Sequence, residues 1–150
     1  VQHPHLMSNT THETAPTAAP PVRNSCGDCT VCCTVMKVRE LNKGANTPCV
    51  HCTAGTGCNI YNERPESCRV YECLWFRSQA FDKPLPAHIR PDRCNVVIGT
   101  VNNGNEAILY VDPTHRDAWR EPAFSDALGL FCSRGIPVYV SCNDQITRVF

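Results

Sequence analysis

The sequence has no net charge and no long hydrophobic run. Its 14 Lys and Arg residues balance 14 Asp and Glu residues. Nucleic-acid-binding domains usually carry a clear basic excess, and attraction to an anionic membrane surface needs the same excess. No apolar stretch approaches the roughly 20 residues that a transmembrane helix requires. The composition therefore predicts a protein that binds neither nucleic acid nor membrane.

Familiar catalytic and targeting motifs are also missing. The chain has no phosphate-binding loop, no dinucleotide-binding fingerprint and no Ser/His/Asp pattern. Its first residues, "VQHPHLMSNTTHETAPTAAPPVRN", lack the basic start and the apolar stretch of a secretory signal. We therefore expect a cytoplasmic protein. Whether it catalyses a reaction, and which protein it partners, stays open at this stage.

Cysteine is the residue that the chain has in excess. There are twelve, and nine of them fall between Cys26 and Cys73. A secreted disulfide scaffold would tend to spread its crosslinks along the chain, whereas a metal site collects its ligands locally. The clustering therefore favours metal binding over disulfide bonding.

Composition divides the chain into four segments. Residues 1–25 are rich in Thr, Pro, Ala and His and are predicted to form a flexible arm, in which His3, His5 and His12 are more typical of a solvated tail than of a metal site. Residues 26–78 form the cysteine-rich unit, and residues 79–94 a proline-rich linker. Residues 95–150 follow as a small α+β lobe, and 26–150 together are expected to form one compact domain.

The pattern from residue 95 onward predicts ββαββ. "NVVIGTV" and "AILYVD" are β-rich runs separated by "NNGNE", which is a hairpin signal. "HRDAWREPAFSDALGLFCSRG" indicates a helical segment that Pro122 can break and Gly135 closes. "IPVYVSC" and "QITRVF" are two further strands. The expected fold class is α+β, with an irregular Cys-rich metal-binding lobe packed on this small ββαββ lobe.

Within the cysteine-rich unit, short helices and loops are expected. "NERPESCRVY" is compatible with a short helix that has Asn62 as its cap and Pro65 in its first turn. Cys68 and Cys73 would point about 140° apart on one continuous helix. If both serve one centre, the helix must end between them.

The spacing Cys-x-x-Cys lets two sulfurs reach one tetrahedral ion from a tight turn, and thiolates are strong ligands for zinc and iron. This spacing occurs three times, and three more cysteines follow within the unit. The candidate metal ligands are Cys26, Cys29, Cys32, Cys33, Cys49, Cys52, Cys58, Cys68 and Cys73. We expect this unit to depend on the metal for its folding, since binding energy then becomes folding energy.

Counting bonds gives two arrangements for the nine thiols. Two separate four-sulfur sites use eight of them, and three zinc ions sharing three bridging sulfurs use all nine. Adjacent Cys32 and Cys33 are expected to face different ways and to serve two centres. His51 and Cys94 remain open as further ligands, with a supporting role favoured for His51 because thiols are already in surplus.

Iron is the alternative to zinc. Cys-x-x-Cys-x-x-Cys also opens the bacterial ferredoxin run, which supports an iron-binding or [4Fe–4S] redox protein using the same cysteines. That run continues with three residues, a cysteine and a proline, whereas here Cys33 follows at once. Zinc is therefore preferred. An extracellular disulfide protein is a weaker third hypothesis.

Other polar residues have simpler interpretations than catalysis. Cys132 and Cys142 are expected to be buried structural thiols. Arg64 and Arg69 either neutralise an anionic sulfur cluster or bond to loop carbonyls. "DPTHRDAWRE" holds carboxylates near a histidine, which is compatible with acid–base chemistry, but a capped helix start explains the same residues more simply.

Three segments together resemble a known family. "CGDCTVCC", "CVHCTAGTGCNIY" and "RPESCRVYECLW" are similar to the CxxCxxCC family of bacterial proteins, which is described as a zinc- or iron-chelating domain. The resemblance covers about residues 25–78. Besides the nine cysteines, the matching residues are Gly57, Tyr61, Arg64, Pro65, Arg69 and Trp75. It implies metal chelation by those cysteines and does not imply a particular reaction.

Overall fold

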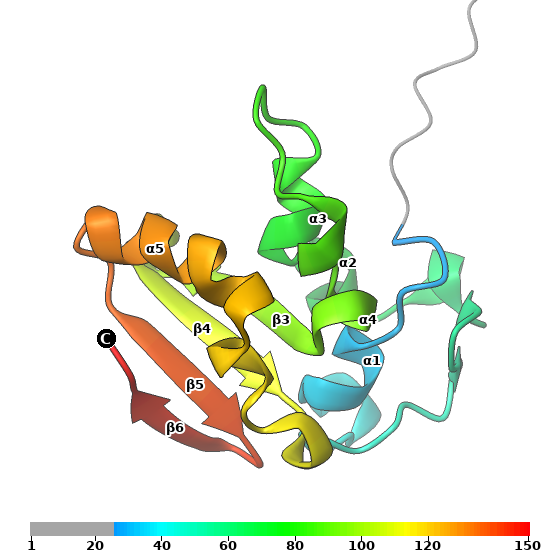
Figure 1. The fold of residues 1–150 in the computed structure, drawn as a ribbon. Helices are drawn as coiled ribbons and strands as arrows, with labels where there is room; N and C mark the ends of the chain where they lie inside the picture. The colour runs from blue at the N-terminus through cyan, green and yellow to red at the C-terminus, as the bar shows by residue number, and fades with distance from the viewer. Residues whose placement is uncertain (1–25) are drawn as a thin grey trace, which may run out of the picture.

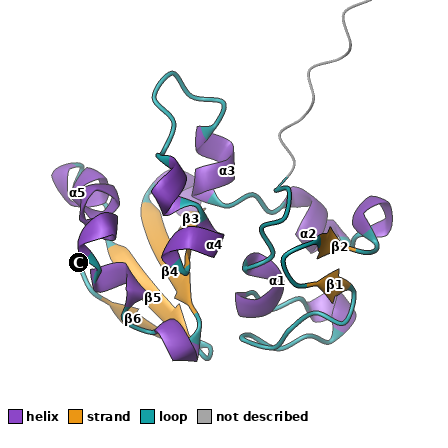
Figure 2. Ribbon diagram, turned by 45° about the vertical axis from the view of Figure 1, so that its right-hand side comes forward, coloured by secondary structure: helices purple, strands orange, loops and turns teal. Residues whose placement is uncertain are grey.

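The computed structural model describes residues 26–150. The predicted arm, 1–25, and its three histidines lie outside this range. Figure 1 and Figure 2 show a four-stranded sheet with helices over one face, beside a lobe of short helices, loops and a small two-stranded sheet. The mixed α+β class is therefore confirmed.

The larger sheet has the strand order β3-β4-β5-β6. Its strands are β3 (Val96–Val101), β4 (Glu106–Val111), β5 (Val138–Cys142) and β6 (Gln145–Arg148). The β3–β4 and β5–β6 pairs are antiparallel hairpins, and β4 pairs with β5 in parallel. Asn143 and Asp144, with φ of 51° and 61°, make the two-residue turn between β5 and β6 that such hairpins favour. Both predicted hairpins are confirmed.

The connection from β4 to β5 is only half helical. Three 3₁₀ turns, η5 (Pro113–His115), η6 (Ala118–Arg120) and η7 (Pro122–Phe124), precede α5 (Ser125–Ser133). The predicted helix was therefore wrong before residue 125. Pro122 lacks an N–H and forces an extended conformation on Glu121, at φ −62° and ψ 143°. Gly135, at φ +66°, closes α5 as predicted.

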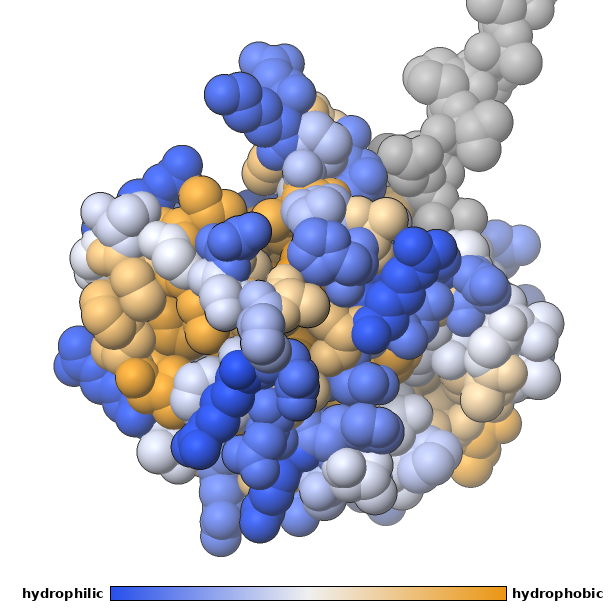
Figure 3. Space-filling model, in the orientation of Figure 1, coloured by the Kyte–Doolittle hydropathy of each residue, from blue (hydrophilic) through white to orange (hydrophobic). Residues whose placement is uncertain are grey.

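One hydrophobic core holds the sheet to its covering helices. It includes β3 and β4 side chains such as Val96 and Leu109, the β5 side chain Val138, and Phe124 and Phe131 from the crossover. Fully burying a side chain of this size stabilises the fold by about 1.5–3 kcal/mol. In the view of Figure 3, the strongest hydrophobic colour gathers beside α5, where Leu130 is half exposed.

The cysteine-rich unit contains only very short elements, as predicted. They are α1 (Cys32–Val35), η1 (Arg39–Leu41), β1 (Cys52–Thr53), β2 (Gly57–Cys58), η2 (Tyr61–Glu63), α2 (Glu66–Val70) and α3 (Leu74–Ser78). Asn62 lies within η2, and Pro65 is the residue that precedes α2. The predicted cap at Asn62 was therefore wrong, because Pro65 sets an extended backbone there. The helix does end between Cys68 and Cys73, as a shared centre requires.

The predicted linker is an ordered connector with two short turns, η3 (Ala87–Ile89) and α4 (Pro91–Cys94). Ile89 and Pro91 are buried, so the connector packs against the sheet lobe. Between these turns, the Arg90 guanidinium pairs with Asp28 and donates to the Cys26 carbonyl at 3.2 Å. Arg90 thereby ties the first cysteine loop to the connector.

Asn46 joins the two lobes at another point. Its Nδ2 donates to the Val111 carbonyl at 3.0 Å, and its Oδ1 accepts the Asn143 backbone N–H at 2.8 Å. One side chain therefore binds both the end of β4 and the β5–β6 turn. Within residues 26–150, no helix is long and apolar enough to cross a membrane.

Candidate metal centre

Two equivalent turns carry the first and the last of the three Cys-x-x-Cys pairs, Cys26/Cys29 and Cys49/Cys52. The Cys29 N–H donates to the Cys26 carbonyl at 3.1 Å, and the Cys52 N–H donates to the Cys49 carbonyl at the same distance. The Cys49 N–H in turn donates to the Cys33 carbonyl at 3.1 Å, which joins the second turn to α1. Tight turns of this kind are how zinc sites present two sulfurs to one ion.

Three further short elements carry or border Cys58, Cys68 and Cys73. Cys58 lies directly opposite Cys52 in the β1–β2 pair. Directly opposed residues in an antiparallel pair have their Cβ atoms about 4.5–5.5 Å apart. Helix α2 carries Cys68, and the break that follows it places Cys73 at the start of α3. The elements α1, β1, β2 and α2, which carry several of the clustered cysteines, lie together at the right of Figure 2.

Electrostatic effects between the thiols separate them into two sets. The inner set, as we name it, comprises Cys26, Cys29, Cys32 and Cys73. Burial raises the pKa of Cys26, and the neighbouring Cys29 raises it further. Burial also raises the pKa of Cys73 to about 11, with Cys26 and Cys29 adding to the effect. These thiols lie close enough to disfavour one another's ionisation.

The outer set comprises Cys33, Cys49, Cys52, Cys58 and Cys68. Burial is the largest cause that raises the pKa of Cys52 to about 11, and the charge of Cys33 is the next largest. Burial raises the pKa of Cys68 as well, and the charges of three other outer thiols contribute. The outer set holds one sulfur more than a tetrahedral ion takes.

Cys32 and Cys33 connect the two sets. The hydrogen bond from Cys32 lowers the pKa of Cys33 to about 6, and it raises that of Cys32 itself. Cys33 also interacts with Cys52 and acts on Cys26, and Cys32 is affected by Cys26 and Cys29. That the adjacent cysteines serve different centres stays a prediction.

Lys43 places a buried positive charge among the sulfurs. Its side chain is 7% exposed, and its ammonium donates to the Thr34 carbonyl at 3.1 Å, the Gly44 carbonyl at 3.2 Å and the Met36 carbonyl. Burial lowers the pKa of Lys43, and the charges of Cys49, Cys33 and Cys32 oppose that shift. Sequence reasoning missed this residue, because nothing in the sequence distinguishes Lys43 from an exposed lysine.

Arg64 fulfils both roles that the sequence left open. Its Nε donates to the Tyr61 carbonyl at 2.8 Å, and its guanidinium lies 3.7 Å from the centre of the Tyr61 ring. Its charge also lowers the pKa of Cys26 and Cys33. Arg69 instead pairs with Glu66 at 2.5 Å on the exposed side of α2.

Cysteines outside the motif have other partners. The Cys94 thiol donates to the Ile89 carbonyl at 3.3 Å, and burial raises its pKa to about 11, with Cys29 contributing. Cys94 therefore borders the inner set while bonding to its own connector. Cys132 and Cys142 are half-buried, so they are less buried than expected, and Cys142 packs against the core of the sheet lobe.

All twelve cysteines are free and half-buried. Among residues 26–150, no three His, Cys, Asp or Glu side chains are gathered closely enough to hold a metal ion. The donor chemistry nevertheless fits zinc or iron, since thiolates are the ligands that these ions take in structural and iron–sulfur sites. Binding would require the sulfurs of each set to move closer together.

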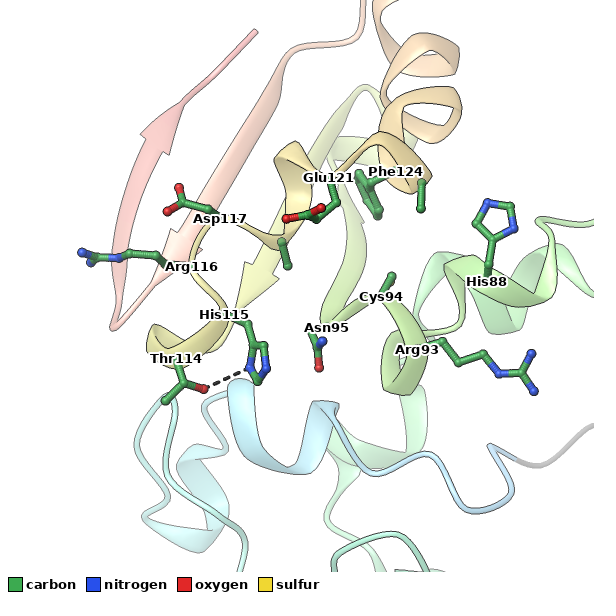
Figure 4. Close-up of a pocket in the computed structure, with 12 residues that line it drawn as sticks. His88, Arg93, Cys94, Asn95, Thr114, His115, Arg116, Asp117, Glu121 and Phe124 are labelled. Atoms are coloured by element: carbon green, nitrogen blue, oxygen red, sulfur yellow. Dashed lines mark hydrogen bonds between the residues drawn. The ribbon is translucent and has the colours of Figure 1, made fainter.

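A cavity of about 610 Å³ lies beside the connector. It is lined by His88, Arg93, Cys94, Asn95, Thr114, His115, Arg116, Asp117, Ala118, Glu121, Ala123 and Phe124. Figure 4 shows His115 and Asn95 facing each other across it, while Arg116 and Asp117 point away. The predicted cap next to it is confirmed, because Asp112 accepts the Thr114 N–H at 2.8 Å. No carboxylate bonds to His115 in the described chain, so the acid–base interpretation gains no support.

No family model, curated protein or solved structure matches the chain. The likeness to the CxxCxxCC family therefore depends on the cysteine segments themselves.

Proposed function

We propose that the protein is a metal-binding protein that chelates zinc through its nine clustered cysteines, taking two or three ions. The metal is either structural or the cargo of a non-catalytic binding module. Sulfurs saturate such an ion and leave no position for a reactive water, so hydrolytic chemistry is not part of the proposal.

One observation carries the proposal: residues 26–73 have almost no hydrophobic core. Their only buried apolar side chains are Val35 and Val38. The core cluster of the molecule is formed by residues from Ile89 onward. A unit of this size without a core is normally stabilised by disulfides or by metal, and every cysteine here is free. Nine half-buried thiols in a coreless unit fit a metal-stabilised fold.

The electrostatics of the thiols support the same conclusion. Burial raises the pKa values of most of them, so as thiols they stay protonated at neutral pH, and as thiolates they would repel one another. A divalent cation would displace the protons and neutralise the charge. Structural zinc contributes about 10 kcal/mol or more to folding in small peptides. Lys43 and Arg64 supply further positive charge around the outer set.

The division into four inner and five outer sulfurs is compatible with either count of ions. One ion in each set uses eight sulfurs and leaves one spare in the outer set. Bridging through sulfurs at the junction, where Cys32 and Cys33 are adjacent, accommodates a third ion. The number of zinc ions per chain would therefore distinguish two separate sites from a bridged cluster of three ions.

Iron is the alternative occupant, because a four-thiol set such as the inner one also suits an iron ion or a [4Fe–4S] cluster. Elemental analysis of anaerobically purified protein tests the proposal. We expect two or three zinc ions per chain and a colourless protein. A brown protein with stoichiometric iron and sulfide would replace zinc by iron. Protein without bound metal, which also fails to take up added zinc, would contradict metal binding altogether.

A further inference from the structure

Tyr71 has a buried hydroxyl group that nothing in residues 26–150 satisfies. Its oxygen has no hydrogen-bond partner among the described residues. A buried phenol usually finds an acceptor, since removing its O–H from water without a partner is unfavourable. Tyr71 lies in the three-residue gap between α2 and α3. The Tyr71 hydroxyl therefore needs a hydrogen-bond acceptor, which another state of the protein would supply.

The surroundings of Tyr71 limit what this acceptor can be. On one side is the sheet: a Cβ added at Gly99 would lie 3.5 Å from the Tyr71 hydroxyl and 2.9 Å from Cε2 of Tyr110. The glycine thus leaves room for both rings on β3. Burial raises the pKa of the phenol, and the charges of Cys73 and Cys32, followed by those of Tyr110 and Cys26, raise it further, so inner-set sulfurs are among its charged neighbours.

A neutral thiol is a weak hydrogen-bond acceptor, whereas a thiolate is a strong one. We infer that the Tyr71 hydroxyl donates a hydrogen bond to an inner-set thiolate, with Cys73 as the first candidate, once metal binding has removed the thiol protons. The inference rests on the proposed function. It makes Tyr71 a positioning residue for the inner site.

This role has a clear signature, because the hydroxyl matters only when metal is bound. In the metal-free protein, where the cysteine-rich unit is expected to lose its structure, Tyr71→Phe should leave the stability unchanged. In the metal-bound protein, the same change removes a hydrogen bond to a ligand. Loss of such an outer partner typically weakens metal binding 10- to 100-fold.

The experiment compares the full chain, Tyr71→Phe and Tyr110→Phe under anaerobic reducing conditions. Tyr110→Phe is the matched control, because Tyr110 contacts the same glycine and only burial raises its pKa, without a cysteine. Zinc affinity is measured by competition with a chromophoric chelator, and urea unfolding gives the stability of the metal-free forms. Cobalt(II) serves as a spectroscopic probe of the sulfurs.

We expect Tyr71→Phe to weaken one zinc site about 10- to 100-fold. The cobalt charge-transfer band should move to lower energy, since the sulfur lone pair loses a stabilising donor. Tyr110→Phe should change neither the zinc affinity nor the energy of the cobalt band. Unaltered affinity and spectrum in Tyr71→Phe would overturn the inference while leaving the proposed function standing. Lower stability of metal-free Tyr71→Phe would also overturn it, because the hydroxyl would then have a structural role. A wild-type chain that takes up no zinc or cobalt would overturn both.

Discussion

Lys43 is the residue whose environment is hardest to explain without negatively charged sulfurs nearby. A buried ammonium is unfavourable unless it is hydrogen-bonded and near opposite charge. Three carbonyl groups satisfy its donors, and four cysteines from both sets supply the potential charge. Lys43 therefore supplies positive charge that would balance ionised sulfurs in the candidate site.

Replacing Lys43 by Met tests this role. We expect about tenfold weaker zinc binding and a loss of about 1–3 kcal/mol in stability, because the carbonyl groups are left without their donor. Lys37→Met is the matched control, since Lys37 is half exposed and pairs only with Asp144 at 3.5 Å in the described chain. Chelator competition and urea unfolding give the two quantities. Equal effects of the two substitutions would show that burial of Lys43 is unrelated to the sulfurs.

Cysteine substitutions separate ligands from bystanders. Cys29→Ser should lower the zinc content and destabilise the cysteine-rich unit, because it removes a sulfur from the inner set. Cys132→Ser should leave the zinc content unchanged, although Cys132 is equally free and half-buried. Elemental analysis of both purified variants measures the outcome. Equal metal loss from the two would contradict the assignment of ligands.

At the level of elements, the predictions that were confirmed concern turns, whose conformation depends on the residues within them. The β3–β4 hairpin and the β5–β6 turn depend on Asn, Asp and Gly residues that tolerate positive φ at those positions. The prediction of a helix in the β4–β5 connection was wrong before Ser125, because prolines divide this segment into separate 3₁₀ turns. Composition alone does not show whether such prolines begin turns or interrupt a helix.

The first of those turns provides a pH-dependent element. The Thr114 side chain and N–H both donate to the Asp112 carboxylate, which lowers the pKa of Asp112 below its ordinary value. Its contribution is therefore present above about pH 4 and is lost as the pH falls through the lowered pKa. Asp112→Ala should cost about 0.5–2 kcal/mol at neutral pH and less in acid. Urea unfolding of both proteins, in the presence of a chelator, at pH 7 and pH 3 measures the difference. A cost that is the same at both pH values would contradict it.

For the whole molecule, long-range contacts decide how the lobes meet, and these left no signal in the sequence. Asn46 and Val111 are 65 residues apart, yet they share a hydrogen bond of 3.0 Å. Asn46 also has φ of 53°, a conformation that asparagine adopts more readily than most residues. Neither this contact nor the position of Lys43 follows from spacing or composition. The nine clustered cysteines, in contrast, are evident in the sequence because they lie close together along the chain, and their role as ligands stays a prediction.

Asn46→Asp should weaken the junction of the lobes. The new carboxylate still accepts from the Asn143 N–H, but its second oxygen faces the Val111 carbonyl where a donor is required. We expect a loss of about 1–3 kcal/mol in stability. Asn62→Asp provides the control, since Asn62 is exposed in η2. Urea unfolding of both variants decides the matter, and similar midpoints would show that Asn46 does not hold the lobes together.

Removal of metal should affect the two lobes differently. The sheet has its own core, whereas residues 26–73 bury only Val35 and Val38 among their apolar side chains. With a strong chelator present, we expect amide exchange to accelerate throughout residues 26–73, while β3, β4 and β5 stay protected. Hydrogen exchange followed by mass spectrometry measures each segment. Uniform acceleration would show that the lobes unfold as one unit.

The parallel pairing of β4 with β5 bears on how the protein emerges from the ribosome. The sheet is incomplete until its last residues are made, because the Val138 N–H bonds to the Phe150 carbonyl. Every clustered thiol has been translated by residue 73, well before that surface is assembled. Under the proposed function, cations captured while synthesis continues would protect these sulfurs from oxidants before the sheet is complete. The supply of zinc during translation would then affect the yield of correctly assembled molecules.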